Sequence, residues 1–201
     1  MRVGLFRRIG SYVLDAIPIF FLLSLLFTLF IGEILKPDNY DVLYEEYQAI
    51  NEDYTERIGV YETQFENGEI TEEEFYEQYD NHMEYFALNT REHVQEIFRY
   101  LINTIFYYLV SFNLIYFLYS GFTKGNTLGR RMAKIELQGN INWWTLFVRE
   151  VIWKFGYWML LGIIGGILLD IAMISLSAKK RAPREIVTGL TVQYVGVQYP
   201  F

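Results

Sequence analysis

The chain has 201 residues, of which 52% are hydrophobic and 18% aromatic, and its formal net charge is −7. That charge is unevenly spread. Residues 33–96 hold 19 acidic and three basic side chains, whereas the remainder holds five acidic and 14 basic ones. The basic residues gather at the ends of apolar runs instead of along one polar face, which argues against nucleic-acid binding. The absence of cysteine excludes disulfides and thiolate metal sites.

The first apolar run extends from Ile9 to Leu35, longer than the roughly 20 residues that a helix needs to cross a bilayer. No small-residue cleavage site follows it, so we expect an uncleaved membrane anchor. The run contains Asp15, and a carboxylate near the centre of such a helix costs about 2.5–3.5 kcal/mol. Arg8 lies seven residues before Asp15, about two turns and about 10 Å along the same face of the helix. This distance is too long for a direct ion pair, so we expect each of the two to meet a different partner.

The acidic insert has a helical pattern of apolar residues. Aromatic and aliphatic residues recur every three or four positions over residues 43–65 and, after an Asn-Gly pair, over residues 75–97. Thr71 and Glu74 have the spacing of a capping box. The pattern predicts two antiparallel helices, the second of which runs into the next membrane helix. Its acidic residues form a solvated face, a docking surface or a region that attracts cations diffusely.

Two further apolar runs follow, Ile97–Phe122 and Thr145–Ser177. The positive-inside rule places the basic clusters in the cytoplasm and the acidic insert outside the cell. The clusters are Arg2, Arg7 and Arg8; then Lys124, Arg130, Arg131 and Lys134; then Lys179, Lys180, Arg181 and Arg184.

The third run can cross the membrane in two ways. A single crossing would leave the last basic cluster outside, against the rule, whereas each arm of a hairpin would be short for a full span. Gly162, Gly165 and Gly166 lie near its middle and would permit a turn or close helix packing. We favour a tilted or re-entrant hairpin, with the single crossing as the alternative.

These patterns predict an all-α membrane protein, a small polytopic bundle of three or four membrane helices with an extracellular acidic helical hairpin. Alternating apolar and polar residues over Met132–Gln138 and Leu190–Val197 predict a short cytoplasmic pair of β-strands. We divide the chain into the first membrane helix with a cytoplasmic N-terminus (1–36), the hairpin insert (37–96) and the remaining membrane part with a cytoplasmic C-terminus (97–201).

The stretch from Arg8 to Asp15 resembles the opening of the RDD family of bacterial membrane proteins, named for an arginine and two aspartates. The segment with Gly129 and Arg130 is similar to the family's cytoplasmic segment after the second helix, and Arg149 falls where the family commonly has an arginine. The resemblance covers residues 1–36 and 97–195. One departure is the Arg184-Glu185 pair, because the family usually has His-Asp there.

The resemblance implies two functions. Some members have been proposed as sodium/proton antiporters, and some similar proteins are thought to restrain membrane proteases. An antiporter would use an intramembrane charge set as a polar path and, at this size, would work as a homo-oligomer. Alternatively, Asp15 pairs with Arg149 or Lys154 as a clasp between helices. The charge set comprises Arg8, Asp15, Arg149, Lys154 and Asp170.

We favour a membrane adaptor or regulator that binds a membrane-protein partner through residues 38–92, because aromatic residues such as those of the insert are enriched at interfaces. The cation/proton antiporter is the alternative. The sequence shows no nucleophile–base pair, zinc-ligand spacing or phosphate loop, so we expect neither enzymatic activity nor a cofactor or metal. The expected location is the cell membrane, with several crossings.

Overall fold

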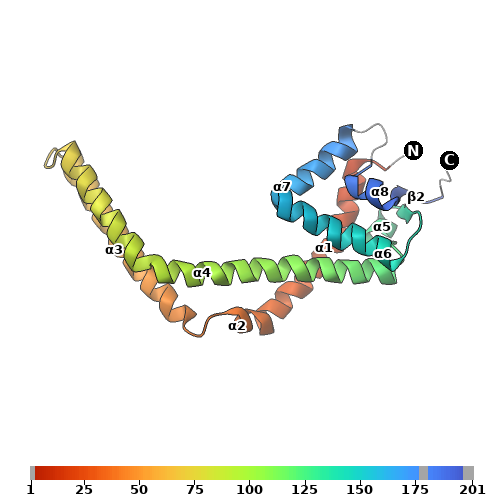
Figure 1. Ribbon diagram of the computed structural model, residues 1–201, viewed down its shortest axis with the longest axis horizontal. Coiled ribbons are helices and arrows are strands. Elements are labelled where there is room, and N and C mark those ends of the chain that lie inside the picture. Colours follow the sequence, from red (N-terminus) through yellow and green to blue (C-terminus); the bar gives the residue numbers. More distant parts are fainter. Residues whose placement is uncertain (1–2, 177–180, 197–201) are drawn as a thin grey trace. The chain divides into compact units, whose positions relative to one another are not determined.

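The computed structural model describes residues 3–176 and 181–196 (Figure 1). Of the features predicted above, five lie outside the described residues: Arg2, the end of the third apolar run at Ser177, Lys179, Lys180 and the strand end at Val197. The chain divides into two compact units, one built from Met1–Phe27 with Tyr108–Phe201 and the other from Thr28–Tyr107. We call the first the bundle unit and the second the hairpin unit.

The hairpin unit consists mainly of two long helices, as predicted. Helix α3 (Tyr40–Glu66) is followed by a short turn, in which Gly68 adopts a φ of 71°, and then by α4 (Glu72–Phe122), which continues into the bundle unit (Figure 1). The predicted capping box is present. The backbone N–H of Thr71 donates to Glu74 at 2.8 Å, and the backbone N–H of Glu74 donates to the Thr71 hydroxyl at 3.3 Å.

Aromatic side chains fill the space between the two helices of the hairpin unit. Ring centroids lie 4.8 Å apart for Tyr40 and Tyr100 and 5.3 Å apart for Phe65 and Phe75, which places α3 antiparallel to α4. Between these two pairs, His82 is only 8% exposed and stacks on a tyrosine of α3 at 5.3 Å. Stacked and edge-on aromatic pairs add about 0.5–1.5 kcal/mol each beyond burial. The hairpin unit therefore has an aromatic core of its own.

Two helices are long and apolar enough to cross a membrane among the described residues. The first, Leu5–Leu35, comprises α1 (Leu5–Leu26), a π-helical stretch η1 (Phe27–Ile31) and α2 (Gly32–Leu35); the second is α4. In the bundle unit the two pack through stacked Phe20 and Phe112, with ring centroids 4.7 Å apart. Their other apolar side chains mostly face outward; Phe21, for example, is 73% exposed. Large contiguous apolar surfaces of this kind are rare on soluble proteins.

The third predicted membrane run forms three consecutive helical elements. They are α6 (Trp143–Phe147), the π-helical turn η2 (Val148–Ile152) and α7 (Trp153–Leu176). The chain stays helical through the glycines at its middle, and Figure 1 shows α7 turning back near its centre. This bend gives the run the outline of a helical hairpin. The number of membrane crossings stays a prediction.

The predicted strand pair is present in the bundle unit. Strand β1 (Ile135–Gln138) pairs antiparallel with β2 (Thr191–Tyr194), with Ile135 opposite Tyr194. Both strands are shorter than predicted, because Met132 instead ends helix α5 (Leu128–Met132) and Leu190 follows helix α8 (Pro183–Thr188). A small apolar core holds the pair; its buried members are Val3, Ile135, Leu137, Leu146, Leu190 and Val192.

Candidate functional site: a buried charge cluster

Asp15 is 3% exposed and binds the segment that leads into α5. Its carboxylate accepts hydrogen bonds from the Thr127 hydroxyl at 2.5 Å, the Gly129 backbone N–H at 2.7 Å and the Tyr119 hydroxyl at 3.4 Å. The predicted clasp of Asp15 with Arg149 or Lys154 is wrong, because among the described residues these neutral donors surround the carboxylate instead. A carboxylate at a helix N-terminus is stabilised by the free N–H groups there.

Gly129 allows this contact by letting two backbones approach closely. A Cβ atom at this position would lie 2.0 Å from the carbonyl oxygen of Ser11 in α1 and 2.9 Å from the Cγ of Asp15. Any larger residue would therefore force α5 away from α1. Gly129 was expected as a family position, and its role here is steric.

Arg8 meets a different partner from Asp15, as predicted. Its Nη1 donates to Glu185 Oε1 at 2.8 Å, and its Nε donates to the carbonyl of Val3 at 3.2 Å. Glu185 is 1% exposed and also lies 3.9 Å from the Nη2 of Arg149. The Arg184-Glu185 pair thus keeps a buried carboxylate at the family position, and that carboxylate ties α1 to α8.

Glu150 lies at the centre of the buried charge cluster, in which it contacts Arg130, Arg149 and Lys154. It was not among the site residues predicted from the sequence. Its Oε1 lies 3.1 Å from Arg149 Nε and 3.5 Å from Arg130 Nη2, and its Oε2 lies 2.8 Å from Lys154 Nζ. Glu150 is 1% exposed. The four-residue spacing between Glu150 and Lys154 is a helical ion-pair signal that could have identified it.

The remaining charges complete two further contacts. Lys154 Nζ lies 4.2 Å from the ring centroid of Tyr116 and 5.0 Å from that of Tyr12, distances typical of cation–π interactions. Asp170 pairs with Arg184 at 3.2 Å. Burial acts to lower the pKa of Arg184, but Asp170 and nearby glutamates outweigh it and raise that pKa above its usual value.

The five predicted members of the charge set therefore do not form one line through the bundle unit. Arg149 and Lys154 meet at Glu150, Arg8 binds Glu185, Asp170 pairs with Arg184, and Asp15 caps α5. This arrangement joins α1, α5, η2, α7 and α8 by buried polar contacts. Across residues 3–176 and 181–196, no group of three or more His, Cys, Asp or Glu side chains could hold a metal ion.

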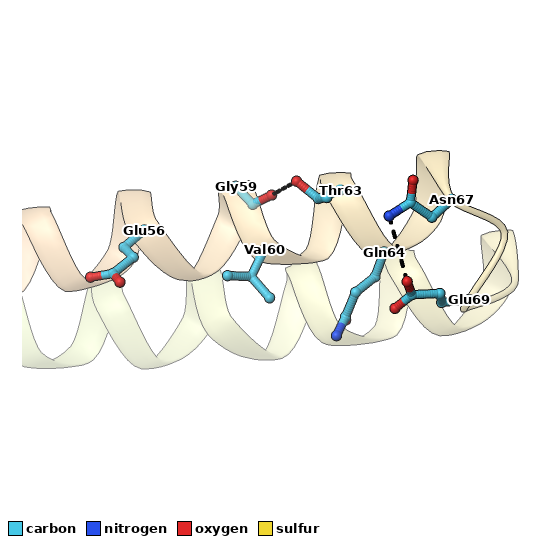
Figure 2. Close-up of a pocket in the computed structure, with 7 residues that line it drawn as sticks. All are labelled: Glu56, Gly59, Val60, Thr63, Gln64, Asn67 and Glu69. Atoms are coloured by element: carbon cyan, nitrogen blue, oxygen red, sulfur yellow. Dashed lines mark hydrogen bonds between the residues drawn. The ribbon is translucent and has the colours of Figure 1, made fainter.

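A second candidate region lies on the hairpin unit near its turn. A shallow recess of about 290 Å³ lies along α3. Figure 2 shows the residues that line it, with Val60 between polar neighbours. The Thr63 hydroxyl donates to the Gly59 carbonyl at 2.7 Å, and the Asn67 amide donates to Glu69 at 3.5 Å. The recess belongs to the region expected to bind a partner, residues 38–92.

Comparison with known proteins gives one match. The model of the RDD family matches residues 2–188, which includes every residue of the buried charge cluster. No curated protein and no solved structure matches the chain. The family match and the two outward-facing apolar helices together indicate a membrane location. Since the match spans most of the sequence, the chain belongs to the RDD family.

Proposed function

We propose that this RDD-family chain is a membrane-anchored adaptor or regulator that binds another membrane protein through its acidic hairpin, residues 38–92. The observation that carries the proposal is that the hairpin unit is compact and has its own aromatic core. Because that core holds the two helices together, the outer residues of the hairpin are not needed for folding and are available for a partner.

The surface of the hairpin unit suits a basic protein partner. Residues 33–96 carry 19 acidic and three basic side chains, so a complementary partner surface would be cationic. Large side chains are exposed among these acids: Tyr76 is 56% exposed, Tyr85 57% and Leu88 67%. Aromatic anchors inside a polar, solvent-accessible rim are typical of protein interfaces.

The buried charge cluster supports an anchoring role for the bundle unit. A carboxylate that carries protons across a membrane has to exchange its partners in each cycle. Glu150 instead contacts three cations at once, and removing one partner from a buried pair typically costs about 3–5 kcal/mol. We therefore assign the cluster a structural role, in which it fixes the helices from which the hairpin extends.

The proposed topology follows the basic clusters. Both termini and the strand pair lie in the cytoplasm, α1 and α4 cross the cell membrane, and the hairpin unit is extracellular. The bent α7, with η2 and α6, enters from the cytoplasmic side and turns back. A single crossing of this run is the alternative.

A cation/proton antiporter working as a homo-oligomer is the second candidate. It is favoured by one observation: Asp15 borders a cavity of about 310 Å³ between α1 and α4, lined mainly by apolar residues such as Leu14, Pro18 and Leu22. A buried carboxylate beside such a space is a candidate ion site. Cation and proton flux in proteoliposomes, compared between the wild type and Asp15→Asn, tests this candidate directly. Loss of flux in the variant would support it, and absence of flux in the wild type would exclude it.

To test the adaptor, residues 38–92 are replaced by a short flexible linker and membrane complexes are crosslinked. The matched control is Val187→Ala, a change at an exposed residue of α8 that leaves the whole hairpin in place. We expect the deletion to lose a specific membrane-protein partner that the Val187→Ala protein keeps. An unchanged set of crosslinked partners in the deletion would contradict the proposal, and protease protection verifies that both variants insert normally.

A further inference from the structure

The bundle unit contains a small, partly open cavity whose walls carry more positive than negative charge. Four guanidinium groups line it, from α1, α5, η2 and α8, together with only two carboxylates. Lys154 and Asp170, which pair with cavity residues, add one charge of each sign. Asp15 does not line the cavity, and counting it still leaves a positive excess. The lining charges are Arg8, Arg130, Arg149 and Arg184 against Glu150 and Glu185.

Two guanidinium donors at this cavity lack an acceptor among the described residues. Arg149 is 2% exposed, and its Nε is bonded to Glu150, but its Nη1 has no hydrogen-bond partner among the described residues. The Nε of Arg184, which lines the same cavity, also has none within that part of the chain. Buried guanidinium donors are normally all satisfied, because each unmet one loses its hydration without replacement.

The volume of the cavity is about 40 Å³. A cavity needs about 10–15 Å³ of such volume to hold one water molecule, so this space holds about three particles of that size. A phosphate group with its substituents has six or more non-hydrogen atoms and exceeds that space. The excess of positive charge also disfavours a cation, because like charges in a poorly solvated space repel strongly.

We propose that the cavity is a binding site for a small monovalent anion of halide size, held by Arg149 and Arg184. The anion supplies the acceptor that Arg149 Nη1 lacks and neutralises part of the excess charge of the cluster. In this account the anion is a component of the folded bundle unit, and its binding stabilises the contact between α8 and η2.

The test measures the apparent Tm of the full chain in lipid nanodiscs at increasing chloride. Sodium gluconate replaces sodium chloride so that the ionic strength stays constant and general screening does not change. We expect a saturable rise of a few degrees in chloride and in bromide, because a ligand that binds only the folded state raises its stability. An equal Tm in chloride and gluconate would overturn the proposal.

Variants locate the effect. In Arg149→Gln the saturable rise of Tm with chloride should be lost. If that variant does not fold, Arg184→Gln provides the same test, because Arg184 is partly exposed and its substitution is better tolerated. Arg57→Gln is the control, since this arginine is 56% exposed on the hairpin unit and pairs only with Asp53 there. A saturable rise that persists in Arg184→Gln, or one that disappears in Arg57→Gln, would contradict the assigned position.

Discussion

The carboxylate of Asp15 accepts the backbone N–H of Gly129 at 2.7 Å, a bond that joins two residues 114 positions apart. A Cβ atom on Gly129 would also lie 2.0 Å from the carbonyl oxygen of Ser11. The carboxylate of Asp15 in α1 is therefore stabilised by a backbone N–H at the start of α5. Gly129 permits this contact because it has no Cβ to clash with α1. Both residues lie in the positions by which the chain resembles its family.

Gly129→Ala should strongly destabilise the bundle unit. The added Cβ would lie 2.0 Å from the carbonyl oxygen of Ser11, and because that oxygen belongs to the backbone of α1, no side-chain movement can relieve the clash. Overpacking of this kind costs about 1–3 kcal/mol or more. The matched control is Gly10→Ala in α1, whose Cβ would meet nothing within 4 Å and should stabilise the helix by up to about 1 kcal/mol. Unfolding in detergent compares the two, and equal effects would contradict the packing described.

Asp15→Asn should destabilise the fold through its bonds to α5. The wild-type carboxylate accepts from three groups, and hydrogen bonds to a charged group contribute about 1.5–3 kcal/mol. Thr127→Val removes one donor while keeping the side-chain shape. We expect the double variant to cost less free energy of unfolding than the sum of the single variants, because both remove the same bond. Strict additivity would show that Thr127 and Asp15 do not interact.

Glu150→Gln should be among the most destabilising single changes in the bundle unit. It leaves Arg130, Arg149 and Lys154 buried without their shared carboxylate, at a cost of about 3–5 kcal/mol. The control is Glu136→Gln in β1, a partly buried glutamate whose side chain accepts one hydrogen bond, from Gln138, within the described part of the chain. Urea unfolding in mild detergent measures both. A loss for Glu150→Gln no larger than that for Glu136→Gln would refute the central place of Glu150.

The start of α4 should loosen in acid. Hydrogen bonds from the Thr71 backbone and hydroxyl hold the pKa of Glu74 below its usual 4.5. A lowered pKa in the folded state adds stability above about pH 4.5, and that stability is lost as the pH falls through the folded pKa. Amide exchange of the first turn of α4, compared with Glu74→Gln at each pH, should show protection that converges as the pH falls through the lowered pKa of Glu74. A constant ratio between the two proteins would contradict this capping role.

Local patterns predicted local structure well. The spacing of Thr71 and Glu74 predicted the capping box, and alternation predicted strands that do pair, with Ile135 opposite Tyr194. These features depend on neighbours in sequence or on a repeating pattern. Contacts between residues 100 or more positions apart depend on how the helices pack. The spacing of residues in one sequence does not predict such contacts.

The charged residues illustrate that limit. Asp15 was expected to need a basic partner, because burial of a carboxylate usually demands one, yet its donors are an N–H group and hydroxyls from the segment before and within α5 and from α4. Glu150 was missed although it lies four residues before Lys154. Its importance comes from Arg130, which reaches it from another element.

The most direct test of the proposed adaptor role is photocrosslinking from single positions on the hairpin unit in intact membranes. A photoreactive residue at Leu88, 67% exposed, is compared with one at Ile186, 56% exposed on α8 of the bundle unit. We predict that Leu88 gives an adduct with one membrane protein, weakened by high salt as expected for a cationic partner surface, and that Ile186 does not. If Leu88 yields no protein adduct, or the same adducts as Ile186, the hairpin is not a docking element.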